Sequence, residues 1–282
     1  MLEFLKYLDR RIIFIFIFLS TAIPLLFDIG LPIGSTKPVR DVYDHIEKLP
    51  PGSKVLVSCD YDPGSMPELF PMNIAVFKHL FDRGMKVYTT ELWPAAPPLV
   101  ENAWRETGGA MGKKYGTDFV NLGFKSGGEV VIVRMGTSIP ELYPEDYYGT
   151  RISKIPMMEG IRDIQSFDFI MNISAGYPGT REWVQQIVSR YNMDLASGCT
   201  AVSAPEYYAY HQSGQILGLL GGMKSAAEYE KLTGIPSENP PIKARAMKGM
   251  DAQSMAHLVI VIFIIIGNVV YFLERKEQKD KR

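Results

Sequence analysis

An uncharged apolar run near each end dominates the hydrophobic pattern of the 282-residue chain. The first run covers residues 12–27 and extends with its flank to Ile33, and the second covers residues 256–273. About 20 helical residues cross the ~30 Å hydrocarbon core of a bilayer. The pattern therefore predicts two transmembrane helices, at 12–33 and 255–273.

The charges that flank these runs predict the orientation of the chain. Basic residues on the terminal side of the two runs are Lys6, Arg10, Arg11, Arg275, Lys276, Lys279, Lys281 and Arg282. Basic residues on the central side, which weaken the asymmetry, are Lys37, Arg40, Lys243, Arg245 and Lys248. Because basic flanks stay in the cytoplasm, the tails 1–11 and 274–282 are predicted to be cytoplasmic and the centre extracytoplasmic, in a two-span protein of the cell membrane. The first run also resembles a cleaved signal peptide, but no A-x-A site follows it, so an uncleaved anchor is the preferred interpretation.

Between the runs, the pattern alternates between strands and helices. A linker with a short helix (34–50) and a linker rich in Pro and Gly (234–254) bracket a domain at 51–233. The expected strands are 54–59, 86–90, 129–135, 168–173 and 194–201, and the expected helices are 67–83, 97–107, 180–191 and 205–232. Continuous apolar strands joined by helices indicate a mainly parallel sheet covered on both faces. The predicted fold class is therefore α/β, doubly wound and Rossmann-like or flavodoxin-like.

Charge and cysteine content exclude several classes of protein. The net charge of −1 gives no basic surface for nucleic acid. Two cysteines, Cys59 and Cys199, are too few for a disulfide scaffold or a four-ligand zinc site. Two half-buried thiols are favoured over a bridge, although a bridge stays open. No metal or cofactor is predicted.

Two acids follow the first expected strand, at Asp60 and Asp62. Ligands of open α/β sheets bind at the carboxyl ends of the strands. The pair is a weak catalytic candidate, because carboxylates there could hold Mg²⁺ or serve as nucleophile and acid, as in haloacid-dehalogenase-like phosphatases. The second acidic pair of such phosphatases is absent, and a turn in which Asp62 or Ser65 caps the next helix is favoured.

A glycine-bearing loop follows the fourth expected strand and opens onto a helix. Its candidate ligand-binding residues are Ser174, Gly176, Tyr177, Gly179 and Thr180. Free backbone N–H groups at a helix start suit a phosphate or a carboxylate. The favoured alternative is a turn in which Thr180 caps the helix.

Cys199 is a further weak catalytic candidate, with His211 as the one plausible partner histidine.

A different pattern runs through the expected helix 205–232, where small residues recur every fourth position at Gly214, Gly218, Gly222 and Ala226. Such spacing allows close helix packing. It predicts either packing onto the domain's own sheet, which is favoured, or an oligomerisation seam.

These patterns favour a membrane-anchored protein whose exported α/β domain is an assembly, scaffold or ligand-sensing module. Its expected partners are the lipid bilayer and further copies of the chain or a membrane complex. The alternative is a membrane-tethered hydrolase or transferase acting on an anionic substrate, with Mg²⁺ as a possible cofactor. A third interpretation, an accessory subunit of an envelope or transport complex, fits a chain whose spans carry no central charge.

Overall fold

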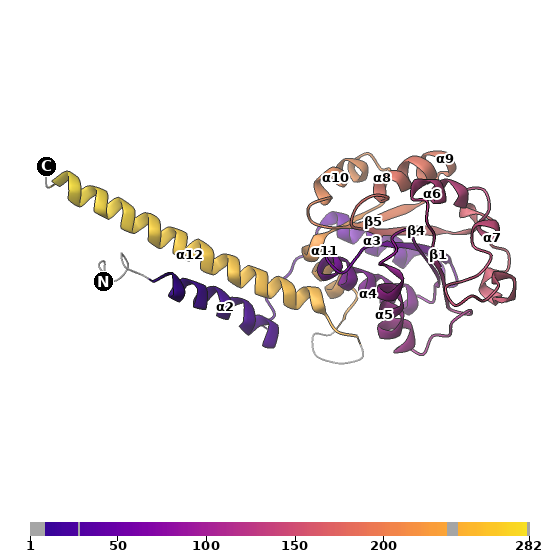
Figure 1. Ribbon diagram of the computed structural model, residues 1–282, viewed down its shortest axis with the longest axis horizontal. Helices are drawn as coiled ribbons and strands as arrows, with labels where there is room; N and C mark the ends of the chain where they lie inside the picture. The colour runs from indigo at the N-terminus through magenta and orange to yellow at the C-terminus, as the bar shows by residue number, and fades with distance from the viewer. Residues whose placement is uncertain (1–8, 28, 236–241, 281–282) are drawn as a thin grey trace. The chain divides into compact units, whose positions relative to one another are not determined.

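The computed structural model describes residues 9–27, 29–235 and 242–280. The chain divides into two compact units, residues 33–247 and residues 1–32 with 248–282. The first unit is an α/β domain built on a six-stranded, all-parallel sheet of order β3-β2-β1-β4-β5-β6 (Figure 1). This is the Rossmann strand order, and it differs from the flavodoxin order. The expected α/β fold class is confirmed.

The strands are β1 (Lys54–Asp60), β2 (Lys86–Glu91), β3 (Phe119–Phe124), β4 (Phe169–Ser174), β5 (Leu195–Cys199) and β6 (Leu219–Gly221). The helices of the domain are α3 (Lys37–Lys48), α4 (Met66–Asp82), α5 (Pro97–Trp104), α6 (Glu129–Met135), α7 (Ile139–Leu142), α8 (Thr180–Trp183), α9 (Ser189–Tyr191), α10 (Ala204–Gln212) and α11 (Gly222–Leu232). Single π-helical turns, Arg105–Gly109 and Val184–Val188, continue α5 and join α8 to α9.

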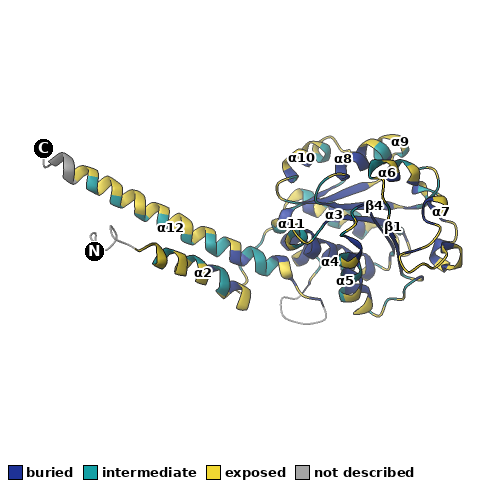
Figure 2. Cartoon of the chain, in the orientation of Figure 1, coloured by how far each residue is buried: buried dark blue, intermediate teal, exposed yellow. Residues whose placement is uncertain are grey.

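The core lies on both faces of the sheet. Strands β1, β2 and β4 are buried almost throughout, as expected of parallel strands between two helical layers (Figure 2). Helix α4 packs on one face, with α5 and α11 against it, and α6, α8 and α10 pack on the other (Figure 1). Helix α4 is buried around most of its circumference, so it is the central helix of its layer.

The expected strand at 129–135 is wrong. These residues form helix α6, and the third strand is β3, at Phe119–Phe124. Seven residues with five apolar side chains fit a buried strand and a buried helix equally well by periodicity alone. Strand β3 was missed because Asn121 and Gly123 interrupt its apolar run.

The expected long helix at 205–232 is also wrong. Helix α10 ends at Gln212, strand β6 follows at Leu219–Gly221, and α11 begins at Gly222. The four small residues therefore do not share a helix face. Gly218 packs against Pro38 and Val42 of α3, and Gly222 against Ala201, so close packing inside the domain accounts for both. Self-association through these positions stays a prediction.

Among the residues that the structure describes, one helix is long and apolar enough to cross a membrane. Helix α12 (Arg245–Asp280) contains a membrane-length window of mean hydropathy 2.5, none of it buried (Figure 2). It begins at Arg245, so the expected linker 234–254 is helical in its second half. Helix α2 (Arg10–Leu26) is exposed and apolar but ends at Leu26, not Ile33. Its 17 residues rise only ~26 Å, and Pro24 lies inside it.

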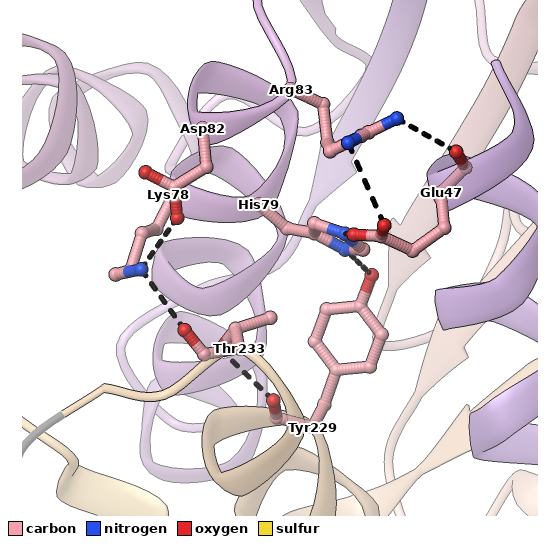
Figure 3. A network of polar contacts seen from close by, with 7 residues as sticks. All are labelled: Glu47, Lys78, His79, Asp82, Arg83, Tyr229 and Thr233. Atoms are coloured by element: carbon pink, nitrogen blue, oxygen red, sulfur yellow. Dashed lines mark hydrogen bonds and ion pairs between the residues drawn. The ribbon is translucent and has the colours of Figure 1, made fainter.

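A polar network around His79 joins α3, α4 and α11 (Figure 3). The His79 Nδ1 atom lies 2.8 Å from the Tyr229 hydroxyl, and Nε2 lies 2.9 Å from Glu47 Oε1. Arg83 donates to the Glu47 backbone carbonyl at 2.9 Å, and the Tyr43 ring stacks on His79 at 4.5 Å. His79 is 3% exposed, and burial lowers its pKa. The neutral ring with both nitrogens partnered fixes the first and last helices of the domain to α4.

We expect Gly218→Ala to destabilise the domain by about 1–3 kcal/mol, because the added methyl overpacks the contact with α3. An ideal Cβ would lie 2.5 Å from Val42 Cγ2 and 2.7 Å from the Pro38 carbonyl oxygen. Urea unfolding of the detergent-solubilised chain, followed by tryptophan fluorescence, measures the change. Gly34→Ala is the matched control, since no atom lies within 4 Å of its added Cβ. Equal midpoints for the two variants would contradict the packing argument.

Candidate functional site

The carboxyl ends of β1 and β4 form the point at which the strand order of the sheet reverses. Asp60 at the end of β1 pairs in register with Ser174 at the end of β4. Open α/β sheets bind ligands at this crevice. The sequence therefore placed its two main candidate groups, Asp60 with Asp62 and the loop 174–180, on neighbouring strands.

Asp60 is fully buried, and protein groups bind both of its carboxyl oxygens. The backbone N–H of Leu92 donates to Oδ1 at 2.6 Å, and the Ser58 hydroxyl donates to Oδ2 at 2.6 Å. Asn172 Nδ2 donates to Oδ2 at 3.4 Å. Burial raises the pKa of the Asp60 carboxyl to about 7, against the lowering effect of Ser58 and Leu92. Asp60 thus connects β1 to β4 and to the loop after β2.

The polar contacts continue from Asp60 across the sheet. Thr180 donates to Asn172 Oδ1 at 3.1 Å, and the Thr180 and Ser197 hydroxyls share a short hydrogen bond. Strands β1, β4 and β5 and the start of α8 therefore share one buried network, whose side chains are 0% exposed. The sequence analysis named Asp60 and Thr180 but missed Ser58, Asn172 and Ser197. These three residues could have been found in the sequence as polar residues within otherwise apolar strands.

Asp62 forms a turn rather than a pair with Asp60. Its Oδ1 atom accepts from the backbone N–H of Ser65 at 3.0 Å and from the Ser65 hydroxyl at 2.8 Å. These hydrogen bonds lower the pKa of Asp62. This is the turn that the sequence analysis favoured at this position. Within the described residues no group of three or more His, Cys, Asp or Glu side chains could hold a metal ion.

The loop after β4 is held by its own polar groups. Ser174 Oγ lies 2.9 Å from the Gly176 carbonyl oxygen and 3.1 Å from that of Pro178. The backbone N–H of Gly179 donates to Glu182 Oε2 at 2.8 Å. The Glu182 carboxylate thus already occupies one amide that an anion would use. Anion binding here stays a prediction.

Tyr177 lies at the outer surface of the same loop. Its side chain is 65% exposed, and its carbonyl oxygen accepts from Trp93 Nε1 at 2.9 Å. This bond connects the loop after β2 to the loop after β4. Thr180 does not cap α8 as expected: Gly179 is the residue before the helix, and the Thr180 hydroxyl points into the buried network.

The two cysteines are free and buried. Burial raises the pKa of Cys199 to about 12, which disfavours the thiolate that a nucleophile requires. His211 does not pair with Cys199, because its Nε2 atom lies 2.8 Å from Asp41 Oδ2. His211 is therefore the partner of Asp41, and Cys199 lacks the histidine that the weak catalytic candidate would need. The His211–Asp41 pair lines a cavity of 700 Å³ between α3 and α10.

A second buried acid, which the sequence analysis missed, ends β2. Glu91 is 0% exposed, and neither carboxyl oxygen has a hydrogen-bond partner within the part of the chain that the structure describes. Burial, and then the charges of Asp60 and Glu101, raise its pKa well above the usual range. Burial therefore disfavours the charged form of the Glu91 carboxyl. Like Asp60, Glu91 is the last residue of its strand, and this position could have marked it as a candidate in the sequence.

Comparison with protein-family models, with curated proteins and with solved structures found no match to this chain.

Asp60 should make the domain less stable as pH rises. The folded chain keeps the Asp60 proton up to about pH 7, whereas the unfolded chain releases it near the ordinary pKa of 3.8. The contribution of Asp60 to the free energy of unfolding is therefore complete below pH 3.8 and is lost as the pH rises to about 7. The loss is at most on the order of 4 kcal/mol. Asp60→Asn should flatten the slope of unfolding free energy against pH across this window.

Urea unfolding of the solubilised chain at several pH values measures that slope. Asp62→Asn is the control, because the pKa of Asp62 is lowered and its stabilisation is lost only as pH falls below 3.8. An unchanged slope for Asp60→Asn would show that Asp60 ionises normally in the folded domain.

Proposed function

We propose that the protein is a two-span membrane protein whose exported α/β domain acts as a ligand-sensing or assembly module. The observation that carries this proposal is that both ends of the α/β domain are hydrogen-bonded to the same helix, α11. Two apolar helices that leave from adjacent points enter the same membrane, so the domain would be held on one side of it.

The start of the domain is hydrogen-bonded to α11. The backbone N–H and the hydroxyl of Thr36 both lie 2.7 Å from Glu228 Oε2. Lys231 Nζ donates to the Ile33 carbonyl oxygen at 2.6 Å. The Glu228 carboxylate is buried, and Lys224 forms an ion pair with it. These contacts fix residues 33–36 beside the last helix before the C-terminal segment.

The end of the domain is fixed to the same helix. Glu230 of α11 is fully buried and accepts from the backbone N–H groups of Arg245, Ala246 and Met247, at 2.9, 3.0 and 2.8 Å. Three of the four unsatisfied amides at the start of α12 therefore have a carboxylate partner. This contact supports an anchoring helix that begins as part of the domain.

The other unit supports a paired hairpin of α2 and α12. Asp251 of α12 accepts from the backbone N–H groups of Gly30 and Leu31, at 2.9 and 3.2 Å. The rings of Phe16 and Phe263 meet edge to face at 6.0 Å. Contact with α12 offsets the shortness of α2, because packing and local thinning of a bilayer accommodate a short span. The flanking basic residues favour cytoplasmic tails.

Cysteine labelling in intact cells tests this topology. We expect Val202→Cys, at a site 90% exposed, to react with a membrane-impermeant maleimide. Asp9→Cys and Arg275→Cys should react only after permeabilisation, because both tails would be cytoplasmic. The native thiols give little background, since both are 0% exposed. Labelling of either tail in intact cells, or protection of Val202→Cys, would contradict the proposal.

One observation favours an enzymatic alternative. The Asp60 carboxyl, with a pKa of about 7, matches the pKa that general acid–base catalysis requires near neutral pH. A hydrolase or transferase for anionic substrates would use it with Asp62 and the loop 174–180. The present geometry disfavours this function, because Asp60 is inaccessible and fully hydrogen-bonded.

A screen of the full chain against phosphomonoesters with Mg²⁺ tests the alternative. It predicts a hydrolysis rate that falls about 100-fold or more in Asp60→Asn, as expected on removing a general acid–base. Asp118→Asn is the control, because Asp118 lies before β3, at the opposite end of the strands. Absence of turnover for every substrate would remove the alternative.

A further inference from the structure

A cavity of 640 Å³ lies at the β3 edge of the α/β domain, away from the ends of β1 and β4. Its walls are largely aromatic and are formed by Trp104, Tyr115, Phe119, Tyr147 and Tyr148, with the carboxylate of Glu101 among them. Cavities of this size hold small molecules, and a few polar groups among apolar walls set their specificity.

The aromatic walls are held in place by a buried acid. The carboxylate of Asp146, 6% exposed, accepts from the Tyr115 hydroxyl at 2.7 Å and from the backbone N–H groups of Tyr148 and Thr150. The Tyr115 and Tyr148 rings meet edge to face at 5.0 Å. A site with fixed walls avoids much of the ordering cost of binding.

The charges of the cavity are suited to a cation. The Tyr148 hydroxyl donates to Glu101 Oε2 in a short hydrogen bond, and Asn121 Nδ2 donates to Oε1 at 2.8 Å. Neither Glu101 nor Asp146 forms an ion pair with a basic side chain of the described residues. Phenols that donate to carboxylates carry more negative ring faces, and such faces attract cations.

Arg105 is the basic residue among those that line the cavity. Its guanidinium is exposed and donates through Nη2 to Asn102 Oδ1 at 2.5 Å. It therefore lies at the solvent side, where its charge is screened. The carboxylate of Glu101 is bound by Tyr148, which lines the cavity, and by Asn121, which is buried behind it, and it remains available to an incoming cation.

We propose that this cavity binds a small organic cation, an alkylammonium or quaternary ammonium group, against the Tyr115 and Tyr148 rings and the Glu101 carboxylate that line it. The inference rests on the proposed role as a ligand-sensing module and names its ligand class. A choline headgroup and a free amine share this chemistry.

Isothermal titration of the full chain in maltoside micelles with choline tests the proposal. The expected result is saturable binding at least about tenfold tighter than that of 3,3-dimethyl-1-butanol, which has the same shape without the charge. Choline binding tighter than glycerophosphocholine binding would assign the site to free cations, and the reverse order to a phosphocholine headgroup.

Three variants locate the binding. Glu101→Gln and Tyr148→Leu should each weaken choline binding about tenfold, and Tyr148→Phe, which keeps the ring, about threefold or less. Tyr208→Leu, on α10, is the matched control and should bind as wild type. Unchanged thermal unfolding would show that each variant folds.

Equal affinity for the neutral isostere, or no saturable binding of choline at ~10 mM, would overturn the cation assignment. So would equal loss of binding in Tyr208→Leu. Each of these results leaves the outcome of the cysteine labelling unaffected, so failure of the cation site and failure of the proposed membrane topology are distinguishable.

Discussion

The α/β domain depends on the attachment of its first and last helices to one another through α4. His79 contacts Glu47 of α3 and Tyr229 of α11, and Glu228 binds the chain at Thr36. A Rossmann sheet alone does not bring its ends together, because its first and last strands are separated by other strands. Here the segment before β1 returns across α11, so both connections to the apolar segments leave from one place.

The α/β class and four of the six strands could be predicted from the sequence, because apolar runs between helical patterns are strong signals. Helix α6 and strand β3 could not be distinguished by the same means. The apolar residues of α6 fit both the helical and the strand periodicity. The polar Asn121 interrupts the apolar pattern of β3, and only the folded structure shows that its side chain is hydrogen-bonded to Glu101 and Gly123. Strand β6 is three residues long, too short for any periodicity. Its place was set by tertiary packing of Gly218 on α3, which local sequence does not encode.

The sequence indicated where the candidate residues lie in the fold, but not how far they are buried or which groups they bind. Topology places Asp60 and the loop 174–180 together, and that part followed from the rule on strand ends. Burial then decides what those groups do. Asp60 is committed to Ser58 and the Leu92 amide, and the Gly179 amide is occupied by Glu182. Residue types at strand ends indicate which side chains lie close together. Whether those side chains form a structural network or a reactive site depends on their exposure and their hydrogen-bond partners, and both depend on the whole fold.

Two buried carboxyls, Glu230 and Glu91, and the half-buried Glu101 have different partners in this domain, and the partner determines the role. Glu230 faces three backbone amides at the start of α12, so its charge is complemented by a helix terminus. Glu91 has no hydrogen-bond partner for its carboxyl oxygens among the described residues, and burial raises its pKa well above the usual range. Glu101 is bound by a phenol and an amide, neither of which neutralises it. Of the three, Glu101 alone combines an uncompensated charge with a cavity, which is the physical reason for placing a cationic ligand there.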